Sequence, residues 1–230
     1  MARMWNTIKT GFDKALAARS EYERAPVSGF VTAVVVLIGL YVVASIFVRP
    51  GEAATDFNFV DERGTVTALS AVLLASGAAF ALSAFLLASK ECLKTRVFWI
   101  LAAAALGVLA LDELLEFHER IGDRIDALGI ATGPVRHWND VIVIAYGFFA
   151  LGFLCYFFST IVRFPRFVEL LAVAFMFFML HTTVDSLVEP PTVVSVIVEE
   201  SCKLYCSAFV SLSFLIGMLA VSTKVEQPAS

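Results

Sequence analysis

Several long blocks of apolar residues, nearly free of charge, constrain this chain more than any other feature of its sequence. Each block is close to the about 20 residues that a helix needs to cross about 30 Å of hydrocarbon. Because a backbone in lipid must satisfy its own hydrogen bonds, such blocks fold as helices. Hydrophobic residues make up 59% of the chain and charged ones 17%, where a soluble domain has about half and about a quarter. We therefore expect an all-α integral membrane protein.

The blocks predict a six-transmembrane-helix bundle that occupies residues 29–222. Ile121, Ile125 and Leu128 continue an apolar stripe beyond the third block, which predicts that this helix runs past the membrane until Gly129. The six predicted spans cover residues 29–48, 67–88, 97–117, 141–162, 167–187 and 197–221.

The segments that flank the bundle are short. In residues 1–28, Trp5, Ile8, Phe12 and Leu16 recur at helical spacing, which predicts an N-terminal amphipathic helix on the membrane surface. Residues 223–230 form a short tail.

The distribution of Lys and Arg predicts the orientation of the chain. If the N-terminus is cytoplasmic, the inner segments hold 11 of the 17 basic residues and the outer segments hold 5, with Lys203 inside a span. Both termini are then cytoplasmic, and we expect the protein in the bacterial inner membrane. The net charge of -4 and the lack of a basic run argue against nucleic acid as a partner.

Three polar clusters, distant in sequence, reach the same outer side under this topology. An ionisable group at mid-membrane costs about 2.5–3.5 kcal/mol, and less near the ends of a span, so such groups usually face the bundle interior. The clusters lie where the third and fifth spans end and where the sixth begins: Asp112, Glu113, Glu116 and His118; His181 and Asp185; Glu199, Glu200 and Lys203.

So many carboxylates at close quarters need protonation or a counter-charge. Lys203 can balance one of them, most simply as an i,i+4 ion pair with Glu199. For the others we predict a divalent metal; histidine and carboxylate without an obvious thiolate suit zinc, iron or manganese. The predicted ligands are Asp112, His118, His181, Asp185, Glu199 and Glu200.

Each cluster also has a purely structural interpretation. The 112–120 stretch can be a solvated end of an amphipathic helix, and His181 with Asp185 can be a hydrogen-bonded pair. His137, beside Trp138 in a loop, is expected to lie at the membrane interface and to bind no metal.

The motif L-D-E-x4-H-E at residues 111–119, with Glu199-Glu200 much later, resembles uncharacterised bacterial multi-pass membrane proteins, and this resemblance implies no activity. More remotely, the L-D-E-L stretch is similar to that of alkaline ceramidase-like membrane hydrolases, whose zinc site uses a Ser, an Asp and three His. That resemblance implies a zinc ligand at Asp112. The chain departs from them in having six predicted spans for their seven, in lacking their upstream Ser and His, and in carrying Asp185 where they have a second His.

These observations favour a metal-dependent membrane hydrolase of a lipid amide or ester, with Glu113 or Glu116 as the general base. The alternatives are a component of a cation transporter and a non-catalytic subunit of a larger membrane complex. The partners we expect are membrane lipids and, in the last case, other membrane subunits. Neither an H-E-x-x-H nor an E-x-x-H motif occurs, which argues against a zincin and against a ferritin-like di-iron centre.

Overall fold

The computed structural model describes residues 28–47, 64–130, 132, 137–188 and 192–226, and every regular element within these ranges is helical. The elements are α2 (Ser28–Phe47), α3 (Thr65–Leu87), the 3-10 helix η3 (Ala88–Lys90), α4 (Leu93–Leu115), α5 (Phe117–Asp126), α6 (Trp138–Tyr156), α7 (Phe158–Ile161), α8 (Phe167–Leu187) and α9 (Val193–Glu226).

Five helices are long and apolar enough to cross a membrane, which supports an integral membrane protein. They are α3 with η3, α4, α6, α8 and α9, and they correspond to five of the six predicted spans. The first predicted span coincides with α2, whose apolar segment Ser28–Ala44 is shorter. The predicted N-terminal surface helix lies outside the described residues.

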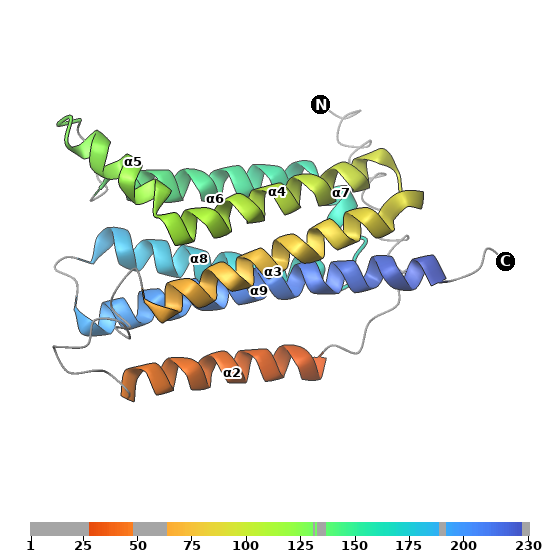
Figure 1. Cartoon of the computed structure of the whole chain (residues 1–230), viewed down its shortest axis with the longest axis horizontal. Helices are drawn as coiled ribbons and strands as arrows, with labels where there is room; N and C mark the ends of the chain where they lie inside the picture. Colours follow the sequence, from red (N-terminus) through yellow and green to blue (C-terminus); the bar gives the residue numbers. More distant parts are fainter. Residues whose placement is uncertain (1–27, 48–63, 131, 133–136, 189–191, 227–230) are drawn as a thin grey trace, which may run out of the picture.

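Helix α9 lies at the centre of the bundle (Figure 1). It packs against α3 and α8 along its length and is the most buried of the five spanning helices. Small residues allow this close packing: the Ser70 and Ser207 hydroxyls are 2.7 Å apart, and a Cβ on Gly77 would lie 3.4 Å from the Ser211 Cα atom. Helix α3 in turn packs against α4, and α5 packs against α6.

Helix α2 runs antiparallel to α9 on one side of the bundle (Figure 1). Near its start, Val31 packs in a cluster with Leu212, whereas Ile38, further along, packs with Leu204. The Tyr205 hydroxyl donates a hydrogen bond to the Val35 carbonyl oxygen at 3.4 Å. This order of contacts places Ser28 at the same end of the bundle as the C-terminal end of α9.

That end of the bundle, which we call the aromatic end, holds a tightly packed apolar core. Trp99 and Phe98 of α4 are fully buried, and their rings contact those of Phe167 on α8 and Phe214 on α9 at centroid distances of 5.8 to 6.3 Å. Aromatic pairs at such distances add about 0.5–1.5 kcal/mol each to the burial of their area. At the opposite end, α4 and α8 finish and α9 begins. We call it the polar end, because the three polar clusters described above lie there.

Gly217 shows how tightly the aromatic end is packed. A Cβ at this position would lie 2.5 Å from the Trp99 ring and 3.0 Å from that of Phe167. We predict that Gly217→Ala lowers the free energy of unfolding by about 1–3 kcal/mol, because the fully buried rings cannot move aside. Gly107→Ala is the matched control, since no atom lies within 4 Å of its Cβ position.

The measurement is denaturant-induced unfolding of both variants in detergent. The control should be as stable as the parent chain or more stable by up to about 1 kcal/mol, as expected for Gly→Ala in a helix. Equal stability of the two variants would contradict the packing described.

Candidate functional site

A sharp break in the helix separates α4 from α5. Glu116 adopts the left-handed conformation, with φ 54° and ψ 40°, and this ends α4 at Leu115. Helix α5 then runs only to Asp126. The prediction of one helix that continues to Gly129 is therefore wrong, because the apolar stripe at Ile121 and beyond belongs to a second, separately directed helix (Figure 1).

The buried carboxylate of Asp112 spans this break. Its Oδ1 accepts a hydrogen bond from the His118 backbone N–H at 2.9 Å, and its Oδ2 lies 2.9 Å from His118 Nδ1. The first contact satisfies one of the unpaired N–H groups at the start of α5. The second fixes the imidazole ring, and with the proton on Nδ1 it leaves Nε2 free to accept a proton. In an unbroken helix, His118 would have pointed away from this side of α4.

The electrostatic surroundings of His118 favour its charged form. Burial opposes protonation, but the hydrogen bond with Asp112 and the negative charges around the ring outweigh it, so the pKa of His118 lies above its usual 6.5. The other charges come from Glu119 and Glu113. The charged form of His118 is therefore favoured more than that of a free histidine side chain.

Lys203 joins α9 to the end of α4. Its Nζ lies 2.9 Å from Glu200 Oε1, one turn away on α9, and 3.4 Å from Glu113 Oε1 on α4. Glu200 is 6% exposed, so these charges are largely removed from water and depend on one another. We call these three residues the Lys203 triad. Sequence spacing favoured Glu199 as the partner; in the structure Glu199 is half-buried and adds its negative charge near Lys203.

His181 of α8 lies between these two groups of charges. It is within electrostatic range of both Lys203 and His118, and its Nδ1 atom is buried without a hydrogen-bond partner. Asp185, one turn further on the same face of α8, is half-buried. Side chains of α4, α5, α8 and α9 thus lie near one another at the polar end.

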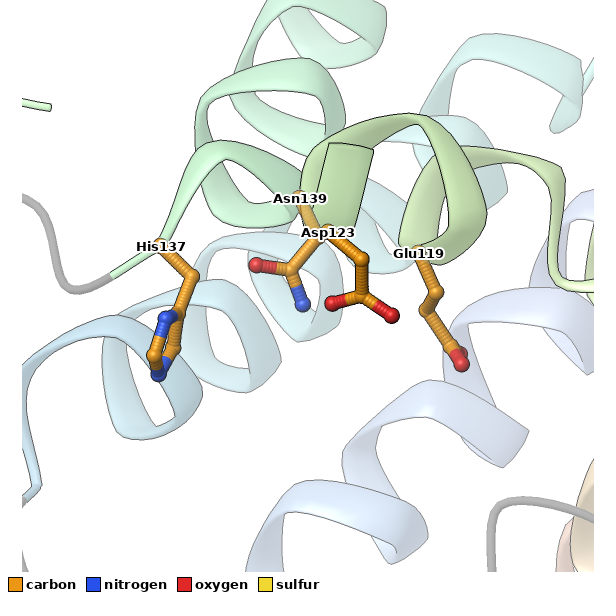
Figure 2. A pocket seen from close by; sticks show the side chains of 4 residues that line it. All are labelled: Glu119, Asp123, His137 and Asn139. Atoms are coloured by element: carbon orange, nitrogen blue, oxygen red, sulfur yellow. The ribbon is translucent and has the colours of Figure 1, made fainter. Parts of the chain in front are cut away.

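A pocket opens at the surface of this end, between α5 and the start of α6 (Figure 2). Glu119 and Asp123 of α5 and Asn139 of α6 extend toward the same space in Figure 2, and His137 lies at its side. The Glu119 carboxylate in the pocket wall lies 3.8 Å from His118 Nε2. The ring that Asp112 orients is therefore directly behind one wall of the pocket.

The start of α6 is tied firmly to α5. The Asp140 carboxylate is 1% exposed and accepts the His137 backbone N–H at 3.2 Å, which caps the helix. Gly122 of α5 allows close approach, because a Cβ there would lie 2.5 Å from the Asn139 backbone nitrogen. The His137 ring lies 3.6 Å from Asp126 and is half-exposed. Its position at the membrane interface stays a prediction.

The sequence analysis missed this pocket and Asp140. One signal was available: His137 and Asp140 have the three-residue spacing of a capping box just before an apolar block. Nothing in the sequence placed Asp123 opposite Asn139, since that pairing depends on the direction of α5 after the break at Glu116.

The predicted site residues fall into separate contacts. Asp112 contacts His118, whereas Lys203 contacts both Glu113 and Glu200. Glu116 forms the break between the helices, and its carboxylate lies 3.9 Å from Arg120. Within the residues the structure describes, no three His, Cys, Asp or Glu side chains are grouped so that they could hold a metal ion. Zinc, iron or manganese bound by the six predicted ligands stays a prediction.

A family model matches residues 29–216, which is most of the chain. The protein belongs to the family described as a domain of unknown function, DUF8692. Neither the curated proteins nor the solved structures contain a match. Membership in the DUF8692 family brings no activity with it, and the similarity to ceramidase-like hydrolases is not established by the match.

The Lys203 triad leads to a stability prediction for this DUF8692 chain. Lys203→Met leaves two largely buried carboxylates without their cation, and we expect it to reduce the free energy of unfolding by up to about 3 kcal/mol. The matched control is Lys90→Met, because Lys90 is exposed at the end of η3. Unfolding in detergent at neutral pH measures both; a Lys203 variant as stable as the control would show that the triad is not formed.

The His118 contact leads to a pH prediction. His118 should titrate above 6.5 in an NMR titration of histidine-labelled protein, and Asp112→Asn should lower that pKa. Because the folded-state pKa is the higher one, this contact stabilises the fold fully below about 6.5 and its contribution is lost as the pH rises through the folded pKa. A His118 resonance that titrates at or below 6.5 in the parent chain would contradict the geometry.

Proposed function

We propose that the protein is a membrane-embedded hydrolase that cleaves a lipid amide or ester at the polar end of the bundle. The observation that supports this is the Asp112–His118 pair: Asp112 is buried, His118 is partly buried and held in one orientation, and the Glu119 carboxylate of the pocket wall lies 3.8 Å from His118 Nε2. A carboxylate that holds Nδ1–H of a histidine leaves Nε2 as the proton acceptor, the arrangement that general bases use in hydrolysis.

In this proposal, His118 takes a proton from a water molecule that attacks the substrate carbonyl carbon. Asp112 stabilises the imidazolium that results, and Nε2 then returns the proton to the leaving amine or alcohol. The role of general base therefore moves from Glu113 and Glu116 to His118. Glu113 is engaged by Lys203, and Glu116 forms the break between the helices.

Apolar side chains around the helix break favour a lipid substrate. Leu114 and Phe117 beside the break, and Ile121 on α5, are about half-exposed. Phe117 and Ile121 share one face of α5, and the pocket residues Glu119 and Asp123 share the other. A helix with one apolar and one charged face is suited to the membrane–water interface. A lipid whose acyl chains contact these residues would bring its polar linkage close to the pocket.

A metal-dependent form of this hydrolysis remains part of the proposal. In this alternative, the imidazoles of His118 and His181 and the carboxylate of Asp185, one turn from His181 on α8, would hold the ion, and His118 would be a ligand instead of the general base. Imidazole and carboxylate suit zinc, iron or manganese, which would lower the pKa of a bound water.

We further propose that α2 is the sixth span and that the polar end faces away from the cytoplasm. Helix α2 has 20 residues, which corresponds to about 30 Å at 1.5 Å per residue. The excess of Lys and Arg in the connections at the other end supports this orientation. The hydrolase would then act on the outer leaflet of a bacterial inner membrane, with both termini in the cytoplasm.

The packing of the core ranks hydrolysis above cation transport, whereas the exposed surface of α6 favours the role of a subunit. A cation transporter needs a polar route to the aromatic end, where packed rings of Phe98, Trp99 and Phe167 occupy the core. A role as a non-catalytic subunit is favoured by α6, which exposes Phe148 and Phe149 and buries little of its surface. Copurification with a second membrane protein would support the subunit role.

The activity test uses purified protein in vesicles that contain a fluorogenic lipid ester or a fluorogenic lipid amide. We predict hydrolysis that falls by about 10²–10⁴-fold in His118→Ala, because the general base is removed. Asp112→Asn should also reduce the rate and should move the acid limb of the pH profile to lower pH. Glu169→Gln, an exposed acid-to-amide change at the aromatic end, is the matched control and should leave the rate unchanged.

Absence of hydrolysis of both substrate classes by the parent chain, or equal rates in the parent and in His118→Ala, would refute the hydrolase proposal.

Elemental analysis tests the metal. For the metal-dependent form, we expect about one zinc, iron or manganese per chain after purification without chelator, and loss of both metal and hydrolysis in His181→Ala. Full activity of a preparation with no bound metal would rule that form out and leave the Asp112–His118 pair as the catalyst.

A further inference from the structure

Two hydroxyl groups on α8 are buried and lack a hydrogen-bond partner in the described part of the chain. Thr182 is 8% and Ser186 is 9% exposed, and neither hydroxyl oxygen is hydrogen-bonded to another residue that the structure describes. Serines in helices usually bond to the carbonyl oxygen four residues earlier. Ser201 and Ser213 of α9 do so at 2.6 and 2.7 Å.

The two hydroxyls lie together on the polar end of α8. Thr182 and Ser186 are four residues apart and so share a face of the helix. Ser186 lies one residue before the end of α8 at Leu187, so this pair lies close to the polar end of the bundle. Two hydroxyl groups that need partners are thus grouped within about one turn.

The charges nearby indicate what such a group would bind. An anion would meet Asp112, Glu113 and Glu200, while the one cation of the Lys203 triad is already shared by two carboxylates. A cation would bind more strongly to carboxylates than to hydroxyls, and those carboxylates are engaged by Lys203 and His118. A neutral group that both donates and accepts hydrogen bonds fits the two hydroxyls best.

We propose that the hydroxyls of Thr182 and Ser186 form a binding site for a neutral hydroxyl group, supplied by ordered water or by the head group of a lipid. The site lies near the polar end of α8 and ends toward the aromatic end, where Ala174 on the same stripe of α8 packs against Phe209 and Leu212. It does not depend on hydrolytic activity: a binding protein or a subunit of a complex would carry the same site.

Thiol accessibility tests the site. In a variant whose native cysteines at 92, 155, 202 and 206 are replaced by alanine, Thr182→Cys and Ser186→Cys are compared with Ala174→Cys. Ala174 is 2% exposed and lies two turns deeper on the same face. A small water-soluble methanethiosulfonate reagent, applied to the protein in vesicles, should modify the first two at least an order of magnitude faster, because a thiol in a dry apolar contact stays protonated and unreactive.

A second labelling experiment shows whether water or a lipid supplies the hydroxyl group. Vesicles that contain a monoacylglycerol should slow the modification of Ser186→Cys if a lipid head group occupies the site, and should leave it unchanged if water does. Either result supports the site. Modification of Thr182→Cys and Ser186→Cys as slow as that of Ala174→Cys overturns it.

Stability provides an independent check in the chain with its native cysteines. If the hydroxyls bind a ligand or water, Thr182→Val and Ser186→Ala should leave the denaturation midpoint unchanged or lower it. If the hydroxyls are simply buried without partners, their removal stabilises the protein and both midpoints rise, which overturns the proposal.

Discussion

The contact of Lys203 with Glu113 and Glu200 is the interaction on which the polar end depends. It joins the last turn of α4 to the first third of α9, two helices that otherwise meet mainly through α3 and the aromatic core. A charge in this position is costly unless it is paired, so each member of the triad requires the other two. Because α9 also packs against α8, the triad holds His181 near the end of α4.

With α4 fixed in this way, the break at Glu116 has a chemical consequence. It turns the chain so that Asp112 can contact both the backbone and the ring of His118, and it directs α5 toward the start of α6, where the pocket forms. The same carboxylate therefore stabilises the beginning of a helix and orients a possible base. In the proposed hydrolase, Asp112 would have a catalytic role beside its structural one.

Much of the fold could be predicted from the sequence, because lipid leaves a hydrophobic block little choice but a helix. The fifth predicted span, 167–187, coincides with α8, and the meeting of the clusters at Glu113 and Lys203 was expected from the topology. The ion-pair partners of Lys203 were harder to predict. Helical spacing favoured Glu199, but in the structure the side chains of α4 and α9 point so that Lys203 contacts Glu113 and Glu200. The left-handed Glu116 has no sequence signal, since glycine or asparagine usually occupies that conformation, and the position of His118 follows from it.

A charge exchange between α4 and α9 tests the central contact most directly. Glu113→Lys alone gives two lysines with one glutamate, Lys203→Glu alone gives three carboxylates, and the double variant restores one lysine between two glutamates. Measured as free energies of unfolding in detergent, both single variants should be destabilised and the double variant should be more stable than either. If the losses of the two single variants simply add in the double variant, α4 and α9 do not meet through Lys203 and the account of the polar end is wrong.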